Sequence, residues 1–115
     1  MILTFAGVIG SGKTRLSTAV AARFGWARAG FGDHLRAVAR EQGEPETRES
    51  LQALGDVLIA RGWAPFCEAV LTRACWKPGL SLAVDGIRHI EALDTLRALC
   101  APSPVALIYV TVPAD

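Results

Sequence analysis

The chain has 115 residues, of which 51% are hydrophobic and 20% are charged, and its formal net charge is +1. This length suits one domain over residues 1–115 with one core, and the apolar content excludes a disordered chain. The near-neutral charge argues against nucleic-acid binding by bulk charge, and three cysteines without a Cys-x-x-Cys pair argue against a disulfide scaffold.

The chain opens with a predicted strand, loop and helix. Residues 2–6 form a continuous apolar run, as expected of a strand that is covered on both faces. A glycine-rich loop over residues 7–12 follows. Residues 14–24 then have helical apolar periodicity, and Gly25 ends this helix because glycine is favoured after helices. Residues 26–31 suit a short second strand.

Three helices are predicted in the middle of the chain. The first has Asp33 as its N-cap and runs to about Gln42. The second begins after Thr47, whose hydroxyl suits an N-cap, and the third covers about residues 65–76. Residues 33–76 therefore form a helical region between two strands.

The last part of the chain alternates strand, helix and strand. Residues 81–85 suit a buried strand that ends in a carboxylate, residues 91–100 suit a helix, and residues 105–112 are mostly β-branched and apolar. This alternation predicts a three-layer α/β/α fold with a parallel sheet.

The loop after the first strand carries a phosphate-binding pattern. Residues 7–14 fill G-x-x-x-x-G-K-[ST], in which glycines let backbone N–H groups approach phosphate oxygens at a helix N-terminus. Lys13 would supply charge for the β- and γ-phosphates, and the Thr14 hydroxyl would ligate Mg²⁺. The predicted residues for ATP and Mg²⁺ are Gly7, Gly10, Ser11, Gly12, Lys13 and Thr14.

A second segment, Asp-Gly-Ile-Arg at residues 85–88, follows the end of a predicted buried strand. Ligands of parallel α/β sheets bind at the carboxyl ends of strands, so we expect Asp85 to hold Mg²⁺ or its water opposite Thr14. An Asp-Gly turn is the alternative. Arg88 is predicted to bind a phosphate with its fork of donors, or else to be a solvated arginine at a helix start.

The third segment is Gly-Asp-His-Leu-Arg at residues 32–36, which places Asp33 and Arg36 one helical turn apart on one face. An acid beside an anion-binding arginine suits a phosphate acceptor that also carries a hydroxyl. Simple N-capping is a compatible role for Asp33. Arg48, at the start of the next helix, is a further candidate for acceptor binding.

Together these segments resemble the nucleoside-monophosphate-kinase-like branch of the P-loop kinases, which includes adenylate and dephospho-coenzyme A kinases. Residues 32–36 are similar to the Gly-Asp-x-Leu-Arg stretch of adenylate kinases, and residues 85–88 resemble their Asp-Gly-Phe-Pro-Arg, shortened by one residue. The resemblance implies strand order 2-3-1-4 and an acceptor-binding region at residues 33–76. Such kinases continue into an arginine-bearing lid and a fifth strand, so we expect this chain to be short at its C-terminus.

The resemblance implies transfer of the γ-phosphate of ATP–Mg²⁺ to a (deoxy)nucleoside monophosphate or a similar phosphorylated small molecule. Lys13, Arg88 and Asp33 would be catalytic, and Asp33, Arg36, Arg48 and Arg88 would bind the acceptor. The alternatives are a nucleotide-binding module without efficient transfer, and a kinase that acts on dephospho-coenzyme A or a small alcohol.

The sequence contains no visible targeting segment or membrane span. We therefore expect a cytoplasmic protein, with neither a membrane nor a nucleic acid as partner, whose Cys67, Cys75 and Cys100 are reduced and buried. In a chain that ends at Asp115, strand 105–112 would lie at the sheet edge, and a homodimer through this strand is one arrangement that would cover it.

Overall fold

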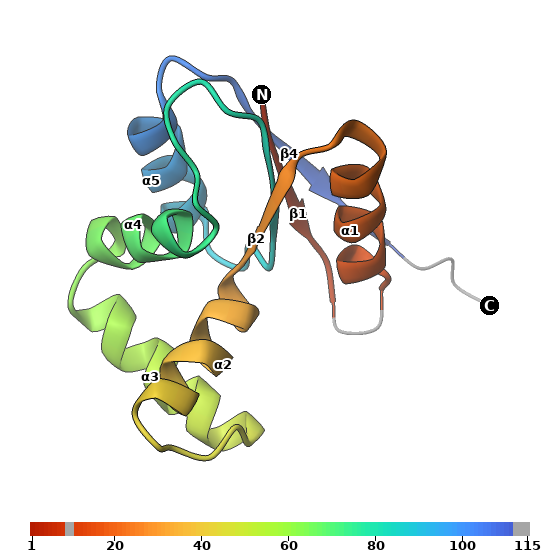
Figure 1. The fold of residues 1–115 in the computed structure, drawn as a ribbon. Coiled ribbons are helices and arrows are strands. Elements are labelled where there is room, and N and C mark those ends of the chain that lie inside the picture. The colour runs from red at the N-terminus through yellow and green to blue at the C-terminus, as the bar shows by residue number, and fades with distance from the viewer. Residues whose placement is uncertain (9–10, 112–115) are drawn as a thin grey trace.

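The computed structural model describes residues 1–8 and 11–111 and alternates strands with helices, as the sequence predicts (Figure 1). In chain order, the elements are β1 (Ile2–Ala6), α1 (Lys13–Phe24), β2 (Ala27–Gly30), α2 (Phe31–Glu41), α3 (Arg48–Ala60), α4 (Trp63–Arg73), β3 (Leu82–Asp85), α5 (Ile90–Cys100) and β4 (Val105–Tyr109).

The four strands form one parallel sheet in the order β2-β3-β1-β4, which confirms the predicted order. The chain leaves β1 in one direction, toward β2, and later leaves β3 in the other, toward β4. The direction therefore changes between β1 and β3, and parallel sheets bind ligands at such a point, outside the carboxyl ends of the strands. The register places Asp85 opposite Phe5 of β1 and opposite Gly30 of β2, so these three strand ends lie together.

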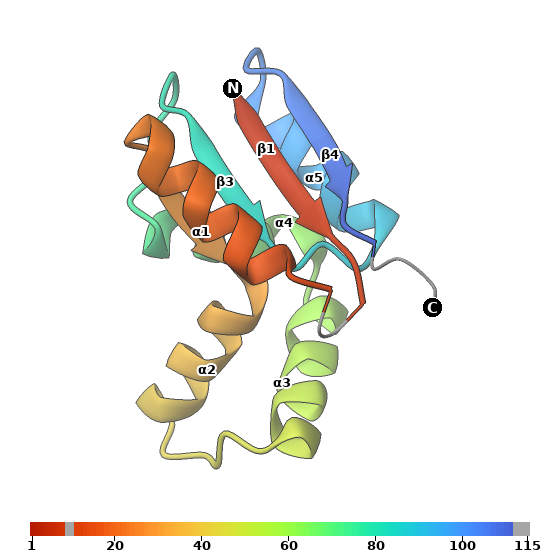
Figure 2. The same cartoon turned by 90° about the vertical axis from the view of Figure 1, so that its right-hand side faces the viewer.

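Helices cover both faces of the sheet (Figures 1 and 2). On one face α1 packs over a small buried cluster of Phe5, Ala21 and Ala83. On the other face α4 and α5 cover a larger cluster that includes the buried residues Phe66 and Leu96. The predicted three-layer α/β/α arrangement is therefore confirmed.

Two helices, α2 and α3, project from the carboxyl end of the sheet (Figure 2). The projection is anchored at its base, where Phe31 and His34 of α2 are buried against Phe66 of α4. Within the predicted helical region of residues 33–76, α4 therefore belongs to the layer on the sheet. Only α2 and α3 stand away from it.

The helix boundaries differ from the prediction at two places. Asp33 is not an N-cap, because α2 already begins at Phe31 and Asp33 lies within the first turn. Its carboxylate is instead paired with Arg28 and Arg36. The third predicted helix, at residues 65–76, is α4, which begins and ends a few residues earlier. Thr47 is confirmed as an N-cap, since its Oγ1 accepts a hydrogen bond of 3.2 Å from the Ser50 backbone N–H.

The last strand is shorter than predicted. Residues 105–112 are predicted as strand, whereas β4 ends at Tyr109, and residues from 112 onward lie outside the described part. Within the described chain β4 pairs only with β1. Leu107 and Tyr109 are exposed at 43% and 61%, so the predicted apolar character of this strand is present at an edge of the sheet.

All three cysteines are predicted to be buried, and the structure confirms this for two of them. Cys67 and Cys100 are buried, and burial raises the pKa of the Cys67 thiol to about 12, so this thiol stays neutral. Cys75, predicted to be buried, is exposed in the turn after α4, where its side chain does not reach the core.

In the part of the chain that the structure describes, every helix is too short or too polar to cross a bilayer.

Candidate functional site

The described part of the loop between β1 and α1, residues 7–8 and 11–12, leads into the first turn of a helix, as the phosphate-binding pattern predicts. Gly12, with φ +92°, directly precedes α1, so the unpaired backbone N–H groups of the first helical turn lie at the loop. The Ser11 backbone N–H donates to the Val8 carbonyl at 3.0 Å, which closes a turn. Gly10 is also predicted as a phosphate-binding residue and lies outside the described residues.

Gly7 is required by close packing. A Cβ atom at this position would lie 2.6 Å from the Val110 carbonyl oxygen and 2.6 Å from Ser11 Oγ. Any larger residue would therefore push the loop away from the segment after β4. Ser11 Oγ is buried and has no hydrogen-bond partner among the described residues, as expected of a group that faces a ligand.

Thr14 and Asp85 are in contact at the carboxyl end of the sheet. Thr14 Oγ1, in the first turn of α1, donates a hydrogen bond of 2.7 Å to Oδ2 of Asp85 at the end of β3. Asp85 is 7% exposed, and its other oxygen, Oδ1, is buried without a partner in the described part of the chain. Such an unpaired buried oxygen beside a hydroxyl fits the water shell of a divalent cation.

A cation at this site would need ligands beyond the protein. Within residues 1–8 and 11–111, no group of three or more His, Cys, Asp or Glu side chains is arranged to hold a metal ion. Mg²⁺ in proteins is typically held by one or two carboxylates, water and substrate phosphates. Thr14 and Asp85 therefore fit a metal that arrives with a nucleotide.

Arg28 is a site residue that the sequence patterns did not reveal. It lies in β2, and its Nη2 donates to Asp85 Oδ2 at 2.6 Å, while Nη1 donates to Asp33 Oδ2 at 2.7 Å. Its Nε donates to Ser17 Oγ of α1 at 3.0 Å. One signal in the sequence could have revealed Arg28: it is a charged residue within a short strand of a covered parallel sheet, where apolar residues are the rule.

Asp33 and Arg36 lie on one face of α2, as predicted, and their side chains form an ion pair. Partial burial opposes ionisation of Asp33, but hydrogen bonds from Arg28 and Arg36 lower the pKa of this carboxyl group. Asp33 therefore remains an anion near neutral pH. Through Arg28 the Asp33 carboxylate is joined to Asp85, so the two carboxylates belong to one network.

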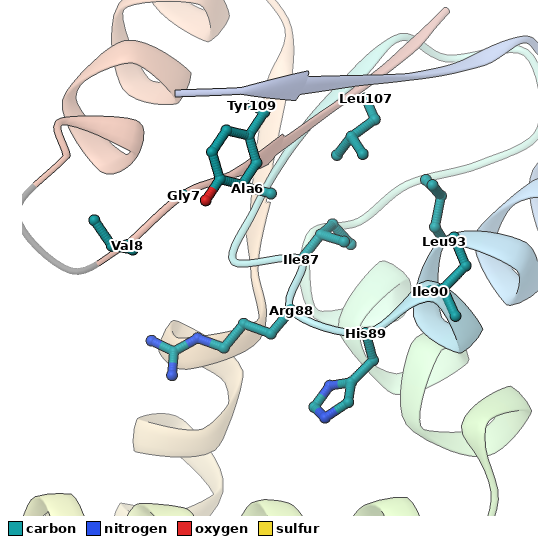
Figure 3. Close-up of a pocket in the computed structure, with 10 residues that line it drawn as sticks. All are labelled: Ala6, Gly7, Val8, Ile87, Arg88, His89, Ile90, Leu93, Leu107 and Tyr109. Atoms are coloured by element: carbon teal, nitrogen blue, oxygen red, sulfur yellow. The ribbon is translucent and has the colours of Figure 1, made fainter. Parts of the chain in front are cut away.

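Arg88 lines a pocket of about 360 Å³ at the carboxyl ends of β1 and β4 (Figure 3). The pocket is mostly apolar and includes Leu93, Leu107 and Tyr109. Figure 3 shows the Arg88 side chain extending away from these apolar residues. Arg88 is exposed, so its guanidinium is accessible to an anion in solution.

Arg48 is placed apart from the other candidates. It is the first residue of α3, at the end of the α2–α3 projection that lies away from the sheet (Figure 2). Within the described residues it has no hydrogen bond to the Asp33–Arg28–Asp85 network. The structure thus brings together Thr14, Asp33, Arg36 and Asp85 at the carboxyl ends of the strands, with Lys13 beside Thr14 at the start of α1. Arg48 is not part of this group.

A buried histidine links the projecting helix α2 to α4. His34 is 5% exposed, and its Nδ1 accepts a hydrogen bond of 2.9 Å from Arg73 Nε. Arg73 also forms an ion pair with Glu41 at 2.8 Å. Burial, followed by the nearby Arg73 charge, lowers the pKa of His34, with Glu41 opposing the shift, so His34 is neutral here.

This arrangement predicts a pH-dependent stability. Between the lowered folded pKa of His34 and its ordinary value near 6.5, the unfolded chain binds a proton that the folded chain does not. The free energy of unfolding should therefore fall as the pH drops from 7.5 to 5.5. Urea denaturation at both values checks this: His34→Asn should flatten the dependence, whereas His89→Asn, at an exposed position, should preserve it. Equal slopes in His34→Asn and the parent would contradict the assignment.

No model of a known protein family matches the chain. The UPF0200 protein PAE1629 of Pyrobaculum aerophilum is 31% identical over 109 residues, which are 95% of this chain and 58% of that protein. The chain thus spans 58% of the length of this curated relative.

Two solved structures are similar to the chain. A protein of Chloroflexus aurantiacus J-10-fl, provisionally named a kinase, aligns with TM-score 0.65 and 19% identity over 95% of this chain and 58% of its own. A gluconokinase of Sinorhizobium meliloti 1021 aligns with TM-score 0.49 and 19% identity over 93% of this chain and 55% of its own. The first alignment shows that the chain shares its α/β fold with that protein.

Proposed function

We propose that this chain is the nucleotide-binding and acceptor-binding part of a P-loop phosphotransferase. In this proposal it moves the γ-phosphate of ATP–Mg²⁺ to a nucleoside monophosphate or a similar phosphorylated small molecule. The observation that carries the proposal is the 2.7 Å contact between Thr14 Oγ1 and Asp85 Oδ2, with Asp85 Oδ1 unpartnered among the described residues. This pairing joins the phosphate loop to a carboxylate where a Mg²⁺–nucleotide would sit.

The nucleotide side of the site rests on the phosphate loop. The backbone N–H groups at the start of α1 would bind phosphate oxygens, and Lys13 would add a positive charge to the β- and γ-phosphates. Thr14 would ligate Mg²⁺ with its hydroxyl, and Asp85 would accept hydrogen bonds from the water of the ion. When bound, Mg²⁺ would neutralise developing negative charge on the transferred group.

The acceptor side rests on α2 and the loop after β3. Arg36 and Arg88 are both exposed and offer guanidinium groups to an acceptor phosphate. Asp33, kept ionised by Arg28 and Arg36, would orient the acceptor. The protein would act by holding both substrates in line and by neutralising charge, which supplies most of the catalysis in phosphoryl transfer.

A direct test measures binding and turnover separately. Calorimetry with ATP and GTP, each with Mg²⁺, establishes nucleotide binding and the base preference. A coupled assay with a panel of nucleoside monophosphates, dephospho-coenzyme A and small alcohols then identifies the acceptor. Nucleotide binding without turnover on any acceptor would favour a nucleotide-binding module. No binding of either nucleotide would contradict the proposal.

A further inference from the structure

We propose that Arg28 is a positioning residue for the divalent cation: it holds Asp85 in the orientation that turns Oδ2 toward Thr14 and leaves Oδ1 available for the ion's water. This inference rests on the proposed function, because it concerns the metal that accompanies the nucleotide. It assigns to Arg28 a role that the phosphate-binding pattern does not contain.

The contacts of Arg28 form a closed ring with the phosphate-loop helix. Nη2 of Arg28 bonds Asp85 Oδ2 at 2.6 Å, and the same oxygen accepts from Thr14 Oγ1 at 2.7 Å. Nε bonds Ser17 Oγ at 3.0 Å, and that hydroxyl donates to the Thr14 carbonyl at 3.0 Å. Arg28 is thus tied to both sides of the Thr14–Asp85 contact.

The guanidinium is divided between two carboxylates. An arginine that only stabilises a carboxylate commonly uses two nitrogens on its two oxygens. Here Nη1 goes to Asp33 Oδ2 at 2.7 Å and only Nη2 goes to Asp85. As a result, both donors on Asp85 reach Oδ2, and Oδ1 is buried without a partner in the described chain.

The position of Asp85 Oδ1 is restrained by the surroundings of Arg28. The Asp85 and Arg28 side chains are only 10% and 21% exposed, so water screens their interaction weakly. Ser17, at 0% exposure, holds the Nε side of the guanidinium against α1. Rotation of the Asp85 carboxylate would break two short hydrogen bonds at once. Outer-shell residues of metal sites typically contribute about 10–100-fold to metal affinity.

The test titrates Mg²⁺ while the affinity of the chain for ADP is measured by calorimetry. ADP affinity in EDTA is measured for the parent chain and for Arg28→Gln, and each Mg²⁺ titration is referred to its own metal-free value. The Mg²⁺ concentration that half-maximally enhances ADP binding should rise about 10–100-fold. Arg23→Gln, an exposed arginine in the last turn of α1, is the matched control and should leave the Mg²⁺ titration unchanged.

A second variant, Arg28→Lys, separates positioning from charge and from folding. Lysine keeps the positive charge that Asp85 and Asp33 require, but it cannot offer three donors in a fixed fork. We expect Arg28→Lys to fold and still to need more Mg²⁺ than the parent. An unchanged Mg²⁺ titration in either Arg28 variant would overturn the inference while leaving the proposed function intact. Failure of the parent chain to bind ADP at all would overturn both.

Discussion

Replacing Lys13 with alanine is expected to lower phosphoryl transfer by about 10²–10³-fold, the usual effect of removing one charge-stabilising group from an active site. Lys13 opens α1 directly after the phosphate loop and is half-buried there. Its ammonium group would interact with the β- and γ-phosphates, and the charge on these groups changes during transfer. ATP affinity should fall as well, and the urea midpoint should stay the same.

The control for this experiment is Lys77→Ala. Lys77 is the other lysine of the chain, and it is exposed in the turn between α4 and β3. The two variants carry the same change in net charge, so a general effect of charge would affect both. Equal transfer rates and ATP affinities in the two variants would show that Lys13 does not act on the nucleotide.

A large loss of stability is expected for Phe66→Ala. Phe66 of α4 is 6% exposed and makes an edge-to-face contact with Phe31, with ring centroids 5.3 Å apart. It also contacts Trp63 at 6.0 Å and His34 at 5.9 Å. Removal of a buried phenyl ring costs about 3–5 kcal/mol, a large share of the roughly 5–15 kcal/mol that stabilises a typical domain.

This loss should also affect the position of α2, because Phe66 is one of the contacts that anchor α2 to the layer on the sheet. Denaturant midpoints of the parent, Phe66→Ala and Phe24→Ala measure it. Phe24 is 61% exposed at the end of α1 and touches Trp26 alone among the recorded aromatic pairs of the described chain. Its removal should cost at most about 1 kcal/mol. Similar midpoints for both variants would contradict the anchoring role of Phe66.

The features that the sequence predicted well are those encoded by neighbouring residues. The apolar run at residues 2–6, the Thr47 cap and the αL glycine at Gly25 each depend on a few adjacent positions. The strand order followed from the family resemblance and was confirmed. Asp85 was expected opposite Thr14 because ligands of parallel sheets bind at the carboxyl ends of strands, and the structure places the two side chains 2.7 Å apart.

The features that the sequence did not predict depend on partners far along the chain. Arg28 is 57 residues from Asp85, and no spacing rule relates a β2 side chain to the end of β3. N-capping by Asp33 was predicted beside its role in acceptor binding because capping is local, whereas its carboxylate is bound by Arg28. The His34–Arg73 bond spans 39 residues and is equally invisible to local patterns.

The sequence by itself predicted the α/β fold and carries the phosphate-binding pattern, because hydrophobic periodicity and the Gly-Lys-Thr spacing act over short distances. Only the tertiary structure decided how the charges are paired. Parallel pairing of β2 with β3 brings Arg28 between Asp33 and Asp85. An ion pair forms wherever folding places opposite charges within a few ångströms, and that distance has no signature in the order of residues.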